Sequence, residues 1–558
     1  MSKDKSKFAS YNRGVPRRRE AFWEGLGASL EAKEEPRPAA AKRPGAAFPY
    51  VIRGKTNMAD ISMKERLEKF GLKKALGYFG KDPDKNIPKI LSFVDAIDRG
   101  NMFRGQRAQF HKVVDNPDNN WYRLIKKLFT DIDTHVLQTI FSNFIVHATL
   151  TGGKRQQEIR EKYGCNVPWA ILLDTTSGCN LHCTGCWAAS YGHKLNLTYE
   201  EIDDIINQGT AMGTYMYIYT GGEPLVRKKD IIRICEAHPD CVFLCFTNGT
   251  LIDDEFAEDL LRVGNFVPAI SVEGDEASTD GRRGDGVFQK VKNAMRILRE
   301  HRLPFGVSCC YTSQNVDKVG TEAFYDWMIE QGAIFCWFFT YMPVDADAPL
   351  ELMVNPDQRE FMYHFVRSMR EKKDLFTLDF FLDGEYVYGC IAGGRYYLHI
   401  NANGDIDPCV FIHYSDSNIR EKTLLEAYQS PLFMEYHKNQ PFNENMLRPC
   451  PLLDNPYRLE KLVKDSGAHC SDPVKPQDVH DLCAKCEAQA KAWKPVADKL
   501  WAESAVDGKH CLNDDDTILP QNRVNPAKVM SMEEAIAHDD AVAAAKKAAK
   551  AAAMKKEA

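Results

Sequence analysis

The sequence contains no run of 18 or more apolar residues, and no apolar segment follows the charged stretch Met1 to Lys7. The first absence predicts that no helix spans a membrane, and the second predicts that there is no secretory signal peptide. The net charge is also small, -6 over 558 residues, which argues against a nucleic-acid binder driven by overall charge. We therefore expect a cytoplasmic protein with no nucleic-acid partner.

Cysteine, by contrast, is plentiful, with 17 residues in the chain. Without an export signal, this number favours metal or redox chemistry over disulfides. Three of them, Cys179, Cys183 and Cys186, form a C-x3-C-x2-C loop directly after the apolar run Trp169 to Leu173. Fe–S clusters usually take four cysteines, and this loop has no fourth. Three thiolates would leave one iron of a [4Fe–4S] cluster open to a small molecule. A zinc knuckle and three structural thiols are the alternatives that the loop by itself leaves open.

The two ends of the chain differ in composition from the remainder. Residues 1–57 carry Lys/Arg runs with scattered Pro and Ala, which predict a disordered basic tail, and residues 513–558 form a polar, Ala/Lys-rich tail. Residues 58–165 predict a helical region, since apolar residues recur at three- and four-residue spacing. Its longest amphipathic stretch is Trp121 to Leu150, and the apolar segment Val136 to Leu150 within it is expected to pack on the next domain. A surface that meets a lipid or a partner helix is the alternative.

From Trp169 the pattern changes to alternating strands and helices, which predicts a parallel sheet covered by helices. The expected strands are Trp169–Thr175, Tyr215–Thr220, Val242–Thr247, Phe266–Val272, Phe305–Tyr311 and Ile334–Met342. The expected helices are Tyr199–Met212, Lys229–Ala237, Asp254–Val263, Val287–Glu300, Thr321–Gln331 and Pro356–Lys372. Because such crossovers are right-handed, the sheet should curl toward a barrel with its site at the carboxyl ends of the strands.

A second motif, Thr220-Gly221-Gly222-Glu223-Pro224, ends the second expected strand. In a parallel barrel this position lies beside the cysteine loop at the end of the first strand. The two glycines let the backbone approach a ligand closely, and Glu223 could hold a cation or orient a loop. We also expect Thr247-Asn248-Gly249-Thr250, at the end of the third strand, to line the same mouth.

The cysteine loop after the first strand and Gly221-Gly222-Glu223 after the second resemble the motifs of the radical S-adenosylmethionine (radical SAM) superfamily. The resemblance implies an α/β fold, a partial (β/α)6 TIM-like barrel over residues 166–375. It also implies a [4Fe–4S] cluster on the three cysteines, with SAM on the open iron. Reductive cleavage of SAM would give a 5′-deoxyadenosyl radical that takes hydrogen from a substrate. The electron would come from a low-potential donor such as ferredoxin or flavodoxin.

The same resemblance suggests roles for further residues. The GGE segment would contact the methionine amino group, and Ser271 and Glu273, at the end of the fourth strand, would contact the ribose. His182 would flank the adenine or lie on the surface. Weaker candidates are Ser308 for the site, and Tyr217, Tyr219, Cys309 and Cys310 as hydrogen donors, with core packing as the alternative for the last four. The cysteines in apolar segments are interpreted as small core residues.

The cysteines after residue 375 carry a second resemblance. Cys390, Gly404 and Cys409 give C-x13-G-x4-C, which resembles the opening of the auxiliary-cluster domain called SPASM or, in its short form, twitch. We place a Cys-rich α+β domain of this kind at 376–512. The complete SPASM pattern continues with C-x2-C-x5-C-x3-C, and this chain lacks that run. We therefore expect one auxiliary [4Fe–4S] cluster, with zinc as the alternative. Its expected ligands are Cys390, Cys409, Cys450 and Cys486, with Cys483 as the substitute, and Cys470 and Cys511 are further candidates.

The sequence thus predicts a radical SAM enzyme with an auxiliary cluster. A lipid or other apolar substrate is slightly favoured, because the helical region before the barrel is absent from a minimal radical SAM fold; peptide or protein modification comes next. Peripheral contact with a membrane or lipid through the basic tail is left open. The rival hypothesis is a non-enzymatic iron–sulfur electron carrier or a zinc-stabilised scaffold, which would need the cysteines but not Gly221-Gly222-Glu223.

Overall fold

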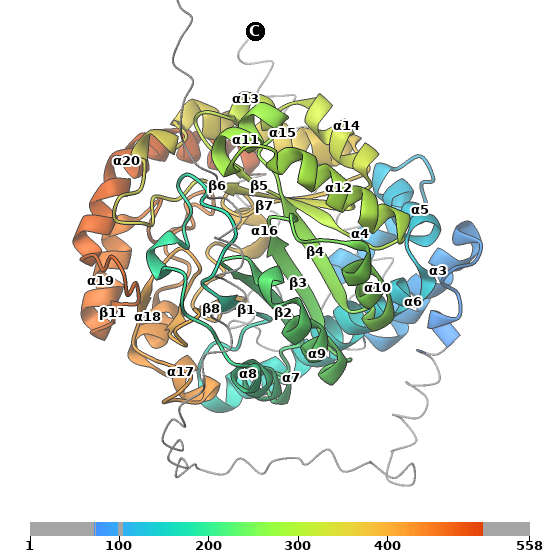
Figure 1. Cartoon of the computed structure of the whole chain (residues 1–558), viewed down its shortest axis with the longest axis horizontal. Helices are drawn as coiled ribbons and strands as arrows, with labels where there is room; N and C mark the ends of the chain where they lie inside the picture. The colour runs from blue at the N-terminus through green and yellow to red at the C-terminus, as the bar shows by residue number, and fades with distance from the viewer. Residues whose placement is uncertain (1–71, 73, 99–103, 506–558) are drawn as a thin grey trace, which may run out of the picture. The chain divides into compact units, whose positions relative to one another are not determined.

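The computed structural model describes residues 72, 74–98 and 104–505. The two expected tails and Cys511 lie outside these residues. The described chain begins with helices that precede the sheet (Figure 1). These are α3 (Pro83–Ile97), α4 (Arg104–Val114), α5 (Asn120–Asp131), α6 (Thr134–Ile140), the π-helix η1 (Phe141–Thr151) and α7 (Gly152–Tyr163). No helix in the described ranges is long and apolar enough to cross a membrane.

The amphipathic stretch Trp121 to Leu150 is not one helix but three elements, α5, α6 and η1. The break lies at Ile132, whose backbone is extended, and Asp133 then caps α6 by accepting the N–H of His135 at 2.8 Å. The expected packing on the next domain is confirmed for η1. The Asn143 side chain donates to the carbonyls of Pro239 and Cys241 at 2.8 and 2.7 Å. These two acceptors lie just before the third strand.

Nine strands form one sheet, in the order β7-β6-β5-β4-β3-β2-β1-β8-β9. Every neighbouring pair is parallel except β8 with β9. The strands are β1 (Ala170–Thr176), β2 (Met216–Gly221), β3 (Val242–Thr247), β4 (Phe266–Ser271), β5 (Gly306–Tyr311), β6 (Phe335–Thr340), β7 (Phe376–Asp379), β8 (Tyr397–Ile400) and β9 (Ile406–Asp407).

Helices connect these strands as the sequence predicts. They are η2 (Ala189–Tyr191), α8 (Tyr199–Ala211), η3 (Pro224–Arg227), α9 (Lys228–Ala237), α10 (Asp254–Val263), α11 (Glu276–Arg283), α12 (Val287–Glu300), α13 (Val316–Val319), α14 (Glu322–Gln331), η4 (Leu350–Leu352) and α15 (Pro356–Lys372). The capping box of Thr198 and Glu201 at the start of α8 is present. Figure 1 shows the helices of this part around the sheet.

The parallel sheet continues beyond residue 375, where the expected barrel ends. β7 pairs in parallel with β6 and so adds a seventh strand to the series, and β8 pairs in parallel with the opposite edge, at β1. Both strands are only four residues long, too short for a pattern in the sequence to assign them to this sheet. The C-terminal part therefore shares a sheet with the barrel strands.

The remaining C-terminal chain is mostly helical. It contains α16 (Gly384–Val387), β10 (Tyr414–Ser415), α17 (Leu424–Tyr428), α18 (Pro431–Asn439), α19 (Pro456–Ser466), β11 (His469–Cys470) and α20 (Val479–Ser504). The chain breaks between α17 and α18, since α17 ends before Ser430. Pro431 starts α18, because a proline fits the first turn of a helix but disfavours helical backbone at the residue before it.

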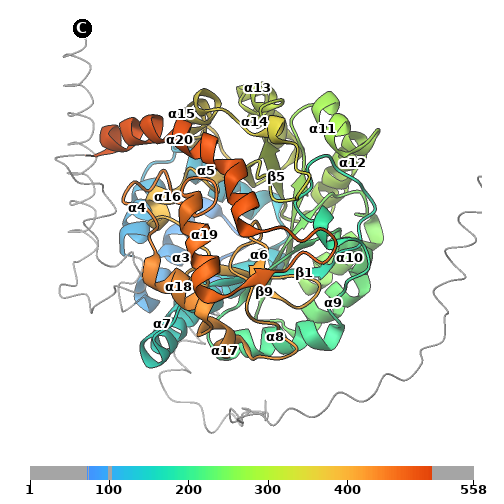
Figure 2. The ribbon, with the colours of Figure 1, turned by 90° about the vertical axis from the view of Figure 1, so that its left-hand side faces the viewer.

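The two faces of the sheet pack differently. Tyr217, Tyr219 and Cys309 lie in the same core cluster as residues of α8, α9, α10, α12 and α14. Alternate positions such as Leu172, Ile218 and Leu244 instead pack with C-terminal residues beyond 380, which are coloured orange to red in Figure 2. Core packing, the alternative to a role as hydrogen donors, is therefore confirmed for Tyr217, Tyr219 and Cys309. Cys310 alternates to the other face and is half-buried.

Candidate active site

The end of β2 packs directly on the loop that leads to Cys179. The N–H of Gly222 donates to the carbonyl of Thr176 at 2.9 Å, and the N–H of Glu223 donates to that of Gly178 at 2.8 Å. A Cβ on Gly222 would lie 2.2 Å from the Gly178 oxygen, so only glycine permits this approach. The two motifs that the sequence places on neighbouring strands therefore form one site.

Glu223 holds this site together rather than presenting a free carboxylate. It is 1% exposed, and burial raises its pKa. One carboxylate oxygen accepts from the Leu225 N–H at 3.0 Å and the Thr247 hydroxyl at 2.7 Å, and the other accepts from the Asn248 N–H at 2.7 Å. Of the two roles open to Glu223 in the sequence, the geometry supports the orientation of a loop.

The expected contribution of residues 247–250 at the mouth is also seen. Asn180, next to Cys179, accepts a hydrogen bond from the Asn248 side-chain amide at 2.8 Å and donates to the Thr250 hydroxyl at 2.8 Å. The segment after β3 therefore contacts the cysteine loop at Asn180, and the end of β3 also contacts Glu223. His182 is exposed, and its ring lies 5.4 Å from that of His193.

The three thiols of the loop are free and half-buried. Burial raises the pKa of Cys179 to about 11 and also raises that of Cys186. The Leu181 N–H points at the Cys179 sulfur at 3.4 Å, and the Arg283 guanidinium lies 4.0 Å from the Cys183 sulfur. Amide and guanidinium donors around sulfur are what a thiolate-bound iron–sulfur cluster uses, so the donor set fits a cluster.

Arg282 and Arg283, at the end of α11, were missed in the sequence. The Thr184 N–H donates to the Arg282 carbonyl at 2.9 Å, and the Arg282 side chain donates back to the Thr184 carbonyl at 3.2 Å. Both arginines also donate to one oxygen of Glu273, at 2.8 Å from Arg282 and 2.5 Å from Arg283. The only sign of these contacts in the sequence is that two basic residues are adjacent.

Glu273 is thus paired with protein cations, and its second carboxylate oxygen is buried without a partner. Ser271 stands opposite Ser308 in the β4–β5 pairing, and both are half-buried on the face away from the helices. An unpartnered buried acceptor of this kind fits a hydroxyl-bearing ligand. The structure places Ser271 at the end of β4, Glu273 just beyond that end, and Ser308 within β5.

Three cysteines of the C-terminal part are neighbours. Burial raises the pKa of all three thiols, of Cys390 to about 11 and of Cys409 to about 12. The charge of Cys390 raises the pKa of Cys409 and Cys450 further, and that of Cys409 raises the pKa of Cys450. The Tyr397 hydroxyl lies 2.7 Å from the Cys409 sulfur. The N–H groups of Phe411 and Leu453 point at the sulfurs of Cys409 and Cys450, at 3.5 and 3.3 Å. This donor set also fits an iron–sulfur cluster.

The expected fourth ligand is less closely tied to these three. Cys486 and Cys483 lie one turn apart near the start of α20, and burial raises the pKa of each to about 12. Asp454 raises the pKa of both Cys450 and Cys486, so it lies near both. Cys470 pairs with Tyr414 in the short β10–β11 ladder.

In the described part of the chain, no three His, Cys, Asp or Glu side chains converge on a point where one metal ion could bind. A structural zinc site requires four such ligands around one ion. An iron–sulfur cluster distributes its cysteines over separate irons, so its ligands need not converge.

A buried polar network joins the barrel, the cysteine loop and the C-terminal part. His399 on β8 lies 2.9 Å from Asp174 of β1 and 3.3 Å from Asp407, and all three are fully buried. The ring of Trp187, the residue after Cys186, lies 5.8 Å from that of His399 and 6.4 Å from that of Phe411. The network therefore anchors the end of the cysteine loop on the C-terminal chain.

Comparison with known families supports this description. The family model described as the radical SAM superfamily matches residues 173–320, which run from β1 into the region after β5. A second model, SPASM, described as an iron-sulfur cluster-binding domain, matches residues 390–452. These matches contain the cysteine loop, the GGE segment, and Cys390, Cys409 and Cys450.

Several curated proteins are similar to this chain. An AdoMet-dependent heme synthase of Methanosarcina barkeri is 26% identical over 48% of this chain and 83% of its own length. A PqqA peptide cyclase of Granulibacter bethesdensis is 23% identical over 48% of this chain and 76% of its own. Among solved structures, Streptococcus suis SuiB bound to S-adenosylmethionine is 20% identical over 54% of this chain and 76% of its own, with a TM-score of 0.46.

These matches and the geometry define an enzyme that works with a [4Fe–4S] cluster and SAM. The chain therefore carries a radical SAM domain at residues 173–320 and, at residues 390–452, a SPASM domain, a type that binds auxiliary iron–sulfur clusters.

Proposed function

We propose that Cys179, Cys183 and Cys186 hold the SAM-binding cluster and that Gly221, Gly222 and Glu223 form the adjoining SAM site. The observation that carries this assignment is the backbone contact of Gly222 with Gly178, which leaves no room for a side chain between the two motifs. Ser271 and Glu273 complete the site on the ribose side, where Glu273 offers a buried acceptor without a partner. His182 is exposed and can flank an adenine.

The protein's own residues orient and shield this site. Glu223 fixes the ends of β2 and β3, and Arg282 fixes the cysteine loop at Thr184. When bound at these residues, the cluster and SAM would supply the radical chemistry that removes a hydrogen atom from the substrate. A low-potential donor such as ferredoxin or flavodoxin supplies the electron. The rigid backbone contacts around the loop keep SAM in one orientation and limit the entry of water.

For the auxiliary cluster we propose Cys390, Cys409, Cys450 and Cys486 as ligands, with Cys483 as the substitute for Cys486. Anaerobic reconstitution tests both assignments through the iron and sulfide content. The wild type should contain two clusters' worth of iron, and a Cys179/Cys183/Cys186→Ala triple variant should keep one. A triple variant that folds but holds no iron would refute the auxiliary cluster.

The face of the sheet away from the helices carries connected aromatic rings. Phe246, Trp337 and Phe339 contact one another with ring centroids 5.5 to 5.6 Å apart, and all three are half-buried. Phe380 lies 5.4 Å from Phe339, and Phe411 lies 6.0 Å from Phe380. Half-buried aromatic rings beside a strand-end site favour a large apolar or planar substrate group.

We therefore propose a lipid or other apolar substrate. The support for it is this aromatic face and not the N-terminal helices, because η1 packs on the barrel. The name of the heme synthase relative, a protein that makes a large planar ring, is consistent with such a face. A peptide is the second candidate, favoured by the names of the PqqA peptide cyclase and of the maturation protein SkfB of Bacillus subtilis.

The substrate class can be tested with fractionated extracts. Organic-soluble and peptide fractions are added to the reduced, reconstituted enzyme, and the 5′-deoxyadenosine formed above the substrate-free level is measured. We expect stimulation by the organic-soluble fraction in the wild type and its loss in Trp337→Ala. Stimulation by the peptide fraction only would contradict an apolar substrate and favour the second candidate.

A further inference from the structure

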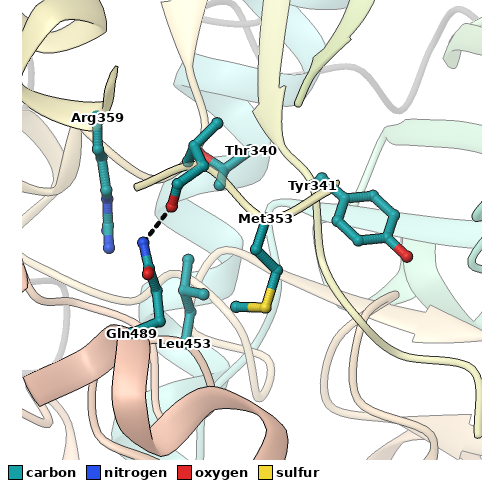
Figure 3. Close-up of a pocket in the computed structure, with 7 residues that line it drawn as sticks. Thr340, Tyr341, Met353, Arg359, Leu453 and Gln489 are labelled. Carbon is teal, nitrogen blue, oxygen red and sulfur yellow. Dashed lines mark hydrogen bonds between the residues drawn. The ribbon is translucent and has the colours of Figure 1, made fainter. Parts of the chain in front are cut away.

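Arg359 on α15 is a cation buried away from solvent, and it has one ionic partner. Its Nη1 lies 2.7 Å from a carboxylate oxygen of Asp454, and both side chains are 0% exposed. The guanidinium also lies 4.4 Å from the ring of Trp493 on α20. Within the described part of the chain, its Nε and Nη2 have no hydrogen-bond partner. Figure 3 shows Arg359 beside Gln489, another α20 residue.

Little space is left beside Arg359. Thr340, Met353 and Leu453 line the same small pocket as Arg359, and this pocket has no room for a water molecule. An unpaired donor in such a place is costly, and a buried ion pair is often no more stable than an apolar pair of the same size. Stability by itself therefore gives little reason for a charged pair here. A low local dielectric also means that the field of each charge is weakly screened.

Asp454 connects Arg359 to the C-terminal cysteines. Its second carboxylate oxygen accepts the backbone N–H of Cys450 at 3.0 Å. The Asn455 side chain donates to the Cys450 carbonyl at 3.0 Å, so the turn after Cys450 is fixed at two points. The charge of Asp454 also reaches the thiols of Cys450 and Cys486. This carboxylate therefore faces two of the four proposed auxiliary ligands.

We propose that Arg359 and Asp454 are positioning residues that set the reduction potential of the auxiliary cluster. Asp454 holds the Cys450 turn in place, and Arg359 cancels the field of Asp454 at the cluster. The inference rests on the proposed auxiliary cluster at Cys390, Cys409, Cys450 and Cys486. Net charge and hydrogen bonds near the sulfurs set the reduction potentials of such clusters, so the ion pair has a function in this proposal.

The two charges should act in opposite directions. Reduction adds a negative charge to the cluster, so an uncompensated Asp454 disfavours it. Arg359→Gln should therefore lower the potential. Asp454→Asn leaves Arg359 uncompensated and should raise the potential. The double variant should return close to the parent, and Arg359→Lys, which keeps the charge, should stay near the parent as well.

The test uses the full-length Cys179/Cys183/Cys186→Ala variant as parent, so that only the auxiliary cluster is present. Each protein is reconstituted anaerobically, its iron is counted, and its cluster is titrated potentiometrically with detection by electron paramagnetic resonance. We expect each single variant to change the ratio of reduced to oxidised cluster about tenfold at a fixed potential, or about 59 mV for one electron. Arg367→Gln is the control, because Arg367 also lies on α15, is 17% exposed and pairs with Glu385 at 2.6 Å.

Shifts of the same sign in both single variants, or no shift with iron retained, would overturn the inference. An equal shift in Arg367→Gln would also overturn it, since the effect would then be a general loosening of α15. If Arg359→Gln loses its cluster, Asp454→Asn still gives the sign of the effect, and Arg359→Lys should still stay near the parent. A parent without iron would refute the proposed auxiliary cluster itself, which is a different result from unshifted potentials in a cluster that is present.

Discussion

Gly222 is the residue with the least room for change in the site. A Cβ there would lie 2.2 Å from the Gly178 oxygen and 2.6 Å from its carbonyl carbon, and backbone does not yield as a flexible side chain does. Gly222→Ala should therefore displace the GGE segment from the cysteine loop. A displacement of about 1 Å can cost a hundredfold in rate, so we expect a loss of this order in 5′-deoxyadenosine formation.

Gly281→Ala is the matched control for this prediction. Gly281 lies in α11, near the same loop, and a Cβ there would have no neighbour within 4 Å. Alanine in a helix is more stable than glycine by about 0.5–1 kcal/mol, so activity should persist and the melting temperature should not fall. Equal activity in the two variants would contradict the close contact that defines the site.

At the scale of single residues, the sequence predicted those features that depend on spacing within a short window. The cysteine loop, the GGE segment and the pair Cys390/Cys409 are motifs within short windows, and they could be read directly. The role of Glu223 as a tie between strands, and the pairing of Arg359 with Asp454, depend on residues far apart in the chain. No spacing rule brings such partners together, because the fold does so.

At the scale of elements, the docking of η1 on the barrel can be measured. Asn143 is 3% exposed and makes two hydrogen bonds to the segment before β3. Asn143→Ala removes both and should reduce the free energy of unfolding by about 1–3 kcal/mol. Thermal or denaturant unfolding measures this change, since a loss of stability lowers the midpoint of the transition.

Asn207→Ala serves as the control for Asn143. Asn207 lies exposed on α8 and bonds to Asp203 on the same helix, so its removal should change stability by less than about 0.5 kcal/mol. If Asn143→Ala changed the free energy of unfolding as little as this control, Asn143 would not hold η1 on the barrel. The alternative interpretation, in which this segment meets a lipid, would then be supported.

The β/α elements were predictable because their periodicity is strong. The six expected strands agree with β1 to β6 within two residues at either end. The sequence did not assign β7 and β8 to this sheet, because each strand has only four residues. β7 pairs with β6, whereas β8 pairs with β1, which is distant in the sequence. The break between α17 and α18 was visible in principle at Ser430-Pro431.

At the scale of the whole molecule, the buried His399 network should make stability depend on pH. Burial lowers the pKa of His399, but the contacts with Asp174 and Asp407 outweigh it and raise that pKa to about 9. An unfolded histidine titrates near 6.5. The folded pKa is the higher one, so the contribution is complete below about pH 6.5 and is lost as the pH rises through 9.

The measurement is the melting temperature from pH 6 to 10 in the wild type and in His399→Gln. The advantage of the wild type should shrink over this range. His480→Gln is the control, because His480 is 62% exposed and pairs with Glu460 on the surface. A wild-type advantage that stays constant with pH would mean that His399 is neutral in the folded protein.

The central claim for the whole molecule is that the cysteine loop and the GGE segment form a SAM-cleaving site. Its most direct test is the amount of 5′-deoxyadenosine that the reconstituted, reduced protein forms from SAM under anaerobic conditions. We expect the wild type to form it and the Cys179/Cys183/Cys186→Ala variant, still carrying its auxiliary iron, to form none. No product from the wild type, or as much from the variant, would contradict the account.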